Sequence, residues 1–318
     1  MGYSKKDAIA YILNSEDLVS KEDGYGVQGL CLIQNYTSCP QKNGGRYIAG
    51  RLQAKGEMQF KAWGNSLAFA SFSANDCQNK VVTVSGIVNK YGGTTSLIID
   101  SIDVPDEELI AVLSPLDFMK EVYDADELFQ KMQTLITSKC SVAALEVFNK
   151  VMADVKERFK TEYAAVSHHD NVKSGLIAHT FKVMRIATIV KMYPDLLKAV
   201  SPDLLYLGCA LHDIGKIFEY ENGCVSQDGK KLSHHTFGVM FLFEHKDYII
   251  AKMGEDFFYS LLSIVEQHHG EFEERPRTLA AYLIHKFDRM DSTLTSLETA
   301  LSSSTDGMVV YDNFKLSF

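Results

Sequence analysis

Several features that would place a chain in a class at once are missing from this sequence. The six cysteines lie far apart and include no CxxC pair, so we expect reduced thiols rather than a disulfide framework. No apolar run reaches the roughly 18 residues that a membrane helix needs. The polar start MGYSKKDAIA also lacks the hydrophobic centre of a secretory signal. These absences predict a cytoplasmic protein that has no membrane partner.

Motifs of other enzyme classes are missing as well. The chain contains no GxSxG and no Walker A sequence, so neither a serine nucleophile nor a P-loop is indicated. We also find no internal repeat and no low-complexity tract. The composition, with 46% hydrophobic and 23% charged residues, is that of an ordinary soluble globular protein.

Charge is unevenly distributed along the chain. The net charge of -9 argues against a protein that coats nucleic acid through a generally basic surface. Between Tyr25 and Pro105, however, seven basic residues face four acidic ones, which leaves this segment near +3 and the remainder near -12. A mildly basic module is therefore joined to an acidic one.

The first hundred residues predict a small β domain. Residues 1–24 form a helical lead-in, and residues 25–106 contain five runs rich in β-branched and aromatic residues. The runs are VQGLCLIQNYT, RYIAGRLQ, MQFKAWG, KVVTVSGIVNKY and TSLIIDSIDV. Five short strands in about 80 residues favour an antiparallel barrel or sandwich. The paired glycines of YGGTT predict a hairpin turn, because they accept positive φ angles.

The rest of the chain reads as helices. From about Glu107 onward the apolar residues recur at helical spacing, which predicts connecting helices over 107–160 and a helical domain over 161–318. The clearest internal loop is NGCVSQDGKK, where a small hairpin is an alternative. The predicted fold class is thus a multidomain α+β protein, a small β domain followed by an all-α bundle.

Histidines are concentrated in this helical half. All ten lie between His168 and His285, and two pairs, His234-His235 and His268-His269, flank apolar helices. A single histidine is usually a core or surface residue, but His212-Asp213 ends the apolar run LLYLGCAL. Such a pair is costly to bury unless it is neutralised, paired or bound to a cation.

A metal ion would account for this cluster. Imidazole and carboxylate ligands suit Fe, Mn, Zn, Ni or Co, and the lack of nearby thiolates argues against a closed structural zinc site. Successive helical residues point about 100° apart, so His212 and Asp213 cannot hold one ion as an i,i+4 pair would. Asp213 can instead bridge two ions if the helix ends there, and Gly215 is consistent with such an end.

These motifs resemble a known family. His179, the string LHDIGK and Asp288 in LIHKFD resemble the H…HD…D signature of the HD phosphohydrolase superfamily. The longer strings HHDNVKSGLIAHT, LSHHTFG and EQHHGE resemble the YhaM-type 3′-to-5′ exoribonucleases, which place an OB-fold domain before the HD domain. The strings YIAGRLQAKGEMQFKAWG and VVTVSGIVNKYGGTTSLIIDSI extend the resemblance to the front half. Ala178 and Ala54-Lys55 depart from the family's pattern without removing a ligand.

The resemblance implies an OB-like barrel over 25–106, an HD domain over 161–318 and a site with two divalent ions, Mn²⁺, Co²⁺ or Fe²⁺. The implied metal ligands are His179, His212, Asp213, His234, His268 and Asp288. Asp213 and Lys216 would be catalytic, the lysine by gripping a phosphate oxygen. His169, His235, His269, Arg275 and Arg277 would support the ligands or contact substrate. For Lys216, Arg275 and Arg277, a solvated position on the surface is an equally open alternative. Within each histidine pair the first member is preferred as ligand.

In the front half, six side chains predict a platform for single-stranded nucleic acid through stacking and charge. They are Arg46, Arg51, Lys61, Trp63, Lys90 and Tyr91. The alternative is that alternating aromatic residues of a small barrel belong to its core, which applies to Phe60 and Trp63 in particular. Tyr91, at the turn, is the better surface candidate.

The leading functional hypothesis is a metal-dependent 3′-to-5′ exonuclease that degrades single-stranded RNA, or DNA, with the barrel feeding the strand to the metal site. One alternative is a nucleotidase or cyclic-nucleotide phosphodiesterase of the HD type. Another is a nucleic-acid-binding adaptor that keeps its metal for stability. The sequence is also compatible with a homo-oligomer.

Overall fold

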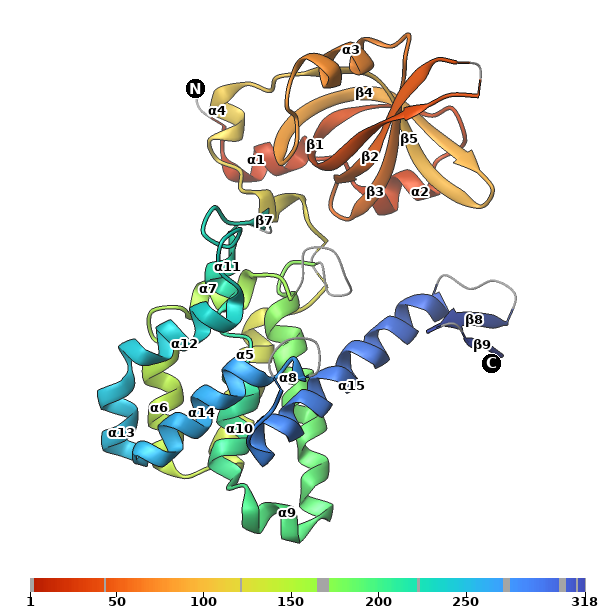
Figure 1. The fold of residues 1–318 in the computed structure, drawn as a ribbon. Coiled ribbons are helices and arrows are strands. Elements are labelled where there is room, and N and C mark those ends of the chain that lie inside the picture. The colour runs from red at the N-terminus through yellow and green to blue at the C-terminus, as the bar shows by residue number, and fades with distance from the viewer. Residues whose placement is uncertain are drawn as a thin grey trace. The chain divides into compact units, whose positions relative to one another are not determined.

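The chain folds into two compact units, Met1–Glu121 and Val122–Phe318, in the computed structural model shown in Figure 1. The structure describes residues 3–42, 44–120, 122–164, 172–221, 224–270, 275–302, 307–312 and 314–317. Each unit has a hydrophobic core of its own.

The first unit is built on a closed five-stranded barrel. Its strands are β1 (Gly26–Pro40), β2 (Arg46–Gln53), β3 (Glu57–Trp63), β4 (Lys80–Tyr91) and β5 (Thr94–Asp103), in the order β1-β2-β3-β5-β4. The pairs are antiparallel except for β3 with β5, which closes the barrel in parallel. The prediction of an OB-like barrel is confirmed, and Gly92 and Gly93 occupy the β4–β5 turn with positive φ angles.

Alternation along the strands separates the barrel core from its outer surface. In β3 the side chains of Met58, Phe60 and Ala62 are buried. Lys61 and Trp63 alternate with them and are not buried, because successive side chains of a strand point to opposite faces. Phe60 therefore belongs to the barrel core, which was the alternative to a role in binding nucleic acid.

Short helices surround the barrel. They are α1 (Lys5–Ala10), α2 (Ser15–Ser20), α3 (Leu67–Ala74), α4 (Glu107–Ile110) and the 3-10 helix η1 (Pro115–Phe118). Helix α3, between β3 and β4, was not predicted. The string GYGVQG, at residues 24–29, has the glycine spacing of a dinucleotide-binding motif. It leads into β1 instead of joining a strand to a helix, so it lacks the structural context of that motif.

The second unit is mainly helical, as predicted. Its helices are α5 (Ala125–Lys139), α6 (Val142–Met152), α7 (Lys156–Thr161), α8 (Gly175–Ala187), η2 (Thr188–Met192), α9 (Pro194–Ala199), α10 (Pro202–Leu211), α11 (Lys216–Glu219), α12 (His234–Glu244), α13 (Lys246–Met253), α14 (Glu255–Gln267) and α15 (Leu279–Ser302). No helix within the described ranges is long and apolar enough to span a membrane.

Two small hairpins accompany these helices. Strands β6 (Tyr220–Glu221) and β7 (Cys224–Val225) pair in the loop where a hairpin was the alternative. Strands β8 (Met308–Tyr311) and β9 (Phe314–Ser317) pair after α15, where the sequence analysis expected only helix.

Helix α10 lies at the centre of the bundle, between α8, α14 and α15. All seven of its residues from Leu205 to Leu211 are buried. The polar residues that follow this apolar helix, His212 and Asp213, are therefore held inside the protein, at the point where α8, α12, α14 and α15 supply the other histidines and carboxylates.

Candidate metal centre

Four side chains from α8, α15 and the end of α10 form a first group of ligand atoms. His179 Nε2 lies 3.3 Å from His212 Nε2 and 3.4 Å from Asp213 Oδ2. It also lies 3.1 Å from Asp288 Oδ1, and His212 Nε2 lies 3.4 Å from Asp213 Oδ2. The structure thus brings together all four residues that the family resemblance assigns to the first ion.

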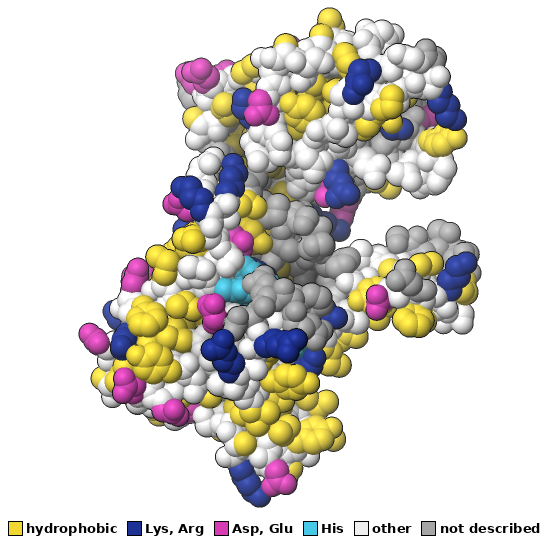
Figure 2. All heavy atoms as spheres, in the orientation of Figure 1, with side chains coloured by type: hydrophobic (Ala, Val, Ile, Leu, Met, Phe, Trp, Pro, Cys, Tyr) yellow, Lys and Arg dark blue, Asp and Glu magenta, His cyan; other side chains and the backbone are white. Residues whose placement is uncertain are grey.

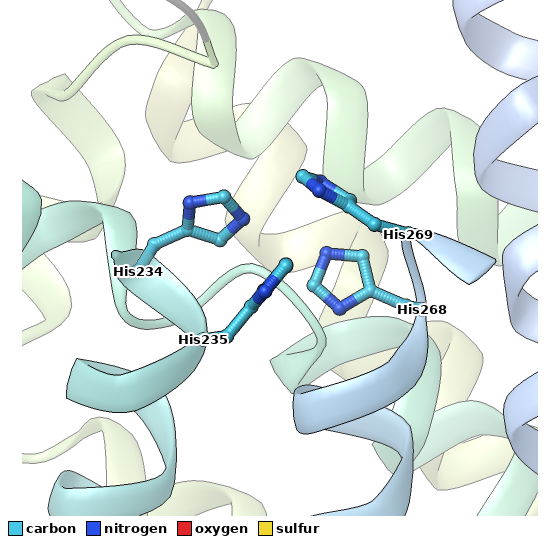
Figure 3. Close-up of side chains that lie close together, drawn as sticks. All are labelled: His234, His235, His268 and His269. Carbon is cyan, nitrogen blue, oxygen red and sulfur yellow. The ribbon is translucent and has the colours of Figure 1, made fainter. Parts of the chain in front are cut away.

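A second group lies on the other side of Asp213. The opposite carboxylate oxygen, Asp213 Oδ1, is 3.3 Å from His268 Nε2 and 3.6 Å from His234 Nε2. His235 and His269 complete a cluster of four histidines, shown in Figure 3, which project from the start of α12 and the end of α14 toward one another. Asp213 therefore stands between the two groups and presents one oxygen to each.

The end of α10 explains how Asp213 reaches both groups. The helix stops at Leu211, with His212 as its C-cap, and residues 213–215 turn before α11 begins at Lys216. His212 still turns its ring back toward α10, where its Nδ1 lies 2.8 Å from the carbonyl oxygen of Cys209. Asp213 has left the helix and points between α8 and α12.

The other ring nitrogens of the candidate ligand histidines are also held in place. Asp291 Oδ2 lies 2.8 Å from His179 Nδ1, and Glu219 Oε2 lies 2.7 Å from His234 Nδ1. His268 Nδ1 lies 3.0 Å from the carbonyl oxygen of Val265. These contacts fix each ring so that its Nε2 points into the site, as is usual for metal-binding histidines.

Burial sets the charge state of several groups. It lowers the pKa of His212, lowers that of His234 well below its usual value and lowers that of His268 to about 3, so these rings are neutral. Burial alone would raise the pKa of Asp213, but Lys216 and the neighbouring histidines bring it well below its usual range. Neutral imidazoles around an ionised carboxylate are the forms that bind a metal.

His179 differs from the other candidate ligand histidines in its pKa. Burial disfavours its charged form, but the three carboxylates that contact it raise its pKa well above the usual value. Those carboxylates belong to Asp213, Asp288 and Asp291. Without a metal, a proton on His179 thus balances some of the negative charge that a cation would otherwise balance.

The unsatisfied atoms of the second group provide a test of whether a metal fits. Among the described residues, Asp213 Oδ1, His234 Nε2 and His268 Nε2 are buried and have no hydrogen-bond partner. Leaving buried polar atoms unsatisfied costs about 1–3 kcal/mol each. A divalent cation would satisfy these three atoms together, and imidazole and carboxylate are ligands that Mn, Fe and Co accept. The residues therefore fit a metal.

Lys216 does not point away from the site. Its Nζ lies 2.7 Å from Asp213 Oδ2, and its side chain is only 12% exposed. Burial lowers the pKa of this amine, but the Asp213 carboxylate more than offsets burial and leaves the pKa raised. Lys216 thus holds the carboxylate between the two histidine groups and is positively charged.

The other predicted site residues lie in different surroundings. His169 falls outside the described residues. Arg275 and Arg277 are exposed in the segment that leads to α15. His235 is buried and His269 is half-buried, with their ring centroids 4.3 Å apart. Figure 2 shows histidine side chains at the surface of the helical unit.

Gly215 allows the close packing of α11 against α12. A Cβ at this position would overlap the backbone oxygen of His234 and approach the nitrogen of Gly238 to 2.5 Å. Its φ of -67° is one that other residues adopt, so the close approach, and not a left-handed cap, requires glycine here.

We therefore expect Gly215→Ala to destabilise the helical unit by about 1–3 kcal/mol, as overpacking typically does. The displaced start of α12 should also lower the content of bound metal, because His234 lies there. Thermal unfolding and metal analysis would measure both effects. Gly26→Ala is the matched control, since a Cβ at Gly26 meets nothing within 4 Å. An unchanged melting temperature would contradict this account of Gly215.

Residues 176–293 match the family model described as "HD domain". The second unit contains an HD domain. All six residues that the resemblance implies as metal ligands lie within the matched segment.

Relatives cover nearly the whole chain. The protein from Geobacillus sp. (strain WCH70) named "3'-5' exoribonuclease YhaM" is 26% identical and covers 92% of this chain and 90% of its own. A protein of the same name from Listeria monocytogenes is 26% identical, with coverage of 91% and 92%. Another from Oceanobacillus iheyensis is 27% identical, with coverage of 89% and 89%. The resemblance to the YhaM-type family is therefore confirmed over both units.

A solved structure of a mitochondrial single-stranded DNA-binding protein from S. cerevisiae also matches, with 15% identity and a TM-score of 0.23. It covers 26% of this chain and 95% of that one, and a score this low carries no argument.

Sequence analysis missed the two acidic residues that orient the HD-domain histidines, Asp291 and Glu219. A signal was present for Asp291, because it follows Asp288 by three residues and so lies on the same face of α15. Glu219 lies beyond the HD motif in a four-residue helix, α11, and no spacing rule connects it with His234.

Replacing Asp291 with asparagine should weaken metal binding by about 10–100-fold, because His179 would lose the carboxylate that orients its ring. Titration of metal into the metal-free protein, followed by calorimetry, would measure this. Asp256→Asn, at an exposed position of α14, is the control. Equal affinities for the two variants would mean that Asp291 does not support the ligand.

Proposed function

We propose that this protein is a metal-dependent 3′-to-5′ exonuclease that degrades single-stranded RNA. The observation that carries the proposal is the position of Asp213 between two groups of histidines, one oxygen directed at each. This is the arrangement expected of a bridging ligand for two cations. The relatives named as 3′-5′ exoribonucleases match both units. They therefore support RNA as the substrate and 3′-to-5′ as the direction of degradation.

In this proposal, His179, His212, Asp213 and Asp288 hold one divalent ion, and Asp213, His234 and His268 hold a second. Mn²⁺, Co²⁺ and Fe²⁺ all suit the ligands. Two such ions would supply a water of lowered pKa and would stabilise the charge on the attacking and leaving oxygens of a phosphodiester.

The protein's own residues place these ions and the substrate. Lys216 keeps the Asp213 carboxylate ionised and fixed through its 2.7 Å ion pair. Asp291 and Glu219 fix the rings of His179 and His234. Burial of the ligand rings keeps most of them neutral, so they stay available as electron-pair donors. No serine or cysteine nucleophile is required.

The outer face of the barrel supplies a surface for the strand. Tyr47 and Trp63 are directly opposite on β2 and β3, with ring centroids 5.3 Å apart, and Lys61 Nζ lies 6.0 Å from the centroid of Tyr47. Trp63 is 37% exposed. Bases stack on exposed aromatic rings of this kind, while cationic side chains contact the phosphates.

A hollow of about 670 Å³ adjoins Trp63. Arg46, Asn65 and Phe69 are among the residues that line it. Arg46 also bonds to Ser38, with Nε donating to Oγ at 2.7 Å, which holds its guanidinium at the rim of the barrel. We place one nucleotide of the strand in this hollow.

The other predicted platform residues are exposed as well. Tyr91 is 84% exposed at the β4–β5 turn, next to Lys90. Arg51 is exposed on the same face as Lys61 and lies 3.5 Å from Glu57, a surface ion pair of little strength.

Cytoplasmic location remains a prediction from the sequence.

Digestion of end-labelled oligonucleotides tests the function. We expect single-stranded RNA to be shortened from its 3′ end, activity to disappear in a strong chelator, and Mn²⁺ or Co²⁺ to restore it better than Ca²⁺. Full activity in chelator, without stoichiometric metal, would refute the metal mechanism. Cleavage of free or cyclic nucleotides with none of single strands would instead identify a small-molecule phosphodiesterase. A metal-loaded protein that binds strands and cleaves neither would be an adaptor.

A further inference from the structure

Helix α15 carries a row of apolar residues that the helical bundle covers only in part. Its apolar residues Leu283, Phe287, Met290, Leu294, Leu297 and Leu301 are spaced alternately by four and three. This is the heptad spacing of helices that pack against another helix. Leu283 and Phe287 pack in the core of the helical unit, which accounts for the first part of the row.

Among the residues that the structure describes, no comparable packing covers the second part of this row. We call its members, Met290, Leu294, Leu297 and Leu301, the apolar stripe. Met290 and Leu294 are each 49% exposed and Leu301 is 43% exposed, whereas Leu297 is half-buried. Single exposed leucines are common on protein surfaces, but several on one face at heptad spacing mark a contact surface.

A groove runs beside the stripe. It measures about 690 Å³ and lies between α8 and the end of α15, with Phe181 and Ile186 on the α8 side. Leu294, Leu297 and Leu301 line its other side. The groove therefore provides a mainly apolar contact surface next to the apolar stripe.

The terminal hairpin adds to this surface. Val309 pairs with Leu316 and Tyr311 with Phe314, which places these four side chains on one face of the β8–β9 hairpin. Val309 is buried, but Phe314 is 64% exposed and Leu316 is 43% exposed. Strand β8 packs against α15, but this packing leaves Phe314 and Leu316 exposed. Figure 2 shows hydrophobic side chains on the hairpin and along the end of α15.

The charges on the groove indicate what covers it. Lys182 and Arg185 line it from α8, and Glu298 lines it from α15. In a twofold contact, the same patch of each copy meets itself. A patch of one sign would repel its copy, whereas a patch that carries both signs can pair Glu298 with the cations across the axis.

We propose that the apolar stripe, the adjoining groove and the β8–β9 hairpin form a twofold interface between two copies of this chain. The stripe of one copy packs against the stripe and groove of the other, and Glu298 of each copy faces Lys182 and Arg185 of its neighbour. This interface does not depend on the proposed function.

The mass of the full chain in solution tests the interface. Light scattering coupled to size-exclusion chromatography should give twice the 35.6 kDa of one chain for the parent protein. The double variant Leu294→Glu/Leu301→Glu should give the mass of one chain, because it buries charge at the contact. Since both leucines are substantially exposed, circular dichroism should show unchanged helicity. Val142→Glu/Met192→Glu, at exposed apolar positions elsewhere in the unit, should remain a dimer.

A charge exchange separates a lost contact from a folding defect. Glu298→Lys should favour the single chain, because three cations then meet across the axis. Adding Lys182→Glu and Arg185→Glu to that variant should restore the doubled mass. A parent protein that is a single chain throughout a wide range of concentration would overturn the proposal. So would a dimer that persists in both the leucine and the Glu298 variants.

Discussion

Replacing Asp213 with asparagine is expected to reduce hydrolysis by more than about 100-fold, since loss of a residue that merely supports a metal ligand already costs 10–100-fold. Asparagine keeps the size and shape of the side chain but removes the charge that both histidine groups share. It also leaves Lys216 buried without its carboxylate partner, which should destabilise the folded state moderately.

Rates on a short labelled RNA, metal content and circular dichroism would be measured together. Asp228→Asn, at an exposed position paired with Lys231, is the matched control and should behave as the parent protein does. Binding of single strands should survive in the Asp213 variant. A folded, metal-loaded variant that is as active as the parent would show that Asp213 is not a bridging ligand.

The second large effect is expected on the barrel. Trp63→Ala should weaken binding of single-stranded RNA by about 1–3 kcal/mol, the usual contribution of one stacked base. Lys61→Glu should weaken binding too and should also flatten its salt dependence, because fewer counterions are released. Both side chains lie on the outer face of β3, so neither change disturbs the core.

Affinity for RNA at two salt concentrations would separate stacking from charge. Tyr25→Ala is the control, as this tyrosine is 48% exposed outside the β2–β3 face. Rates on very short substrates should change little in the Trp63 variant, because the metal site is intact. Equal losses for Trp63→Ala and Tyr25→Ala would mean that the β2–β3 face does not bind the strand.

Much of the barrel could be read from the sequence because its strands carry alternating β-branched residues and its turns carry glycine. Helix α3 escaped because LAFASFSA is apolar or small on all sides and shows no helical periodicity. The string MVVYDNFKLS contains a signal for the β8–β9 hairpin, because Asp is a turn-forming residue. In the structure Asp312 adopts a positive φ at this turn. That signal was short, and it followed the long helical stretch of α15.

The metal centre was predictable where motifs marked it. His212 and Asp213 follow the apolar run LLYLGCAL, so their burial could be inferred from the sequence. The roles of Asp291 and Lys216 depend on side-chain directions that only packing defines. Lys216 illustrates the difference: the resemblance implied a phosphate contact, with a solvated surface position equally open, whereas the structure pairs its amine with Asp213. For Gly215 the sequence predicted a helix end correctly, but the approach of the His234 carbonyl to this glycine was not visible in it.

The route of the chain through the metal centre also has a consequence for the order of events during synthesis. His179 comes from α8, near the middle of the chain, whereas Asp288 comes from α15, the last helix. Domains generally fold as units, N-terminal first, while the chain is being made. The barrel can therefore be complete while the first ion still lacks one of its four ligands. If the proposed function holds, a growing chain carries its strand-binding barrel before it carries a working nuclease, and cleavage is delayed until α15 has been added.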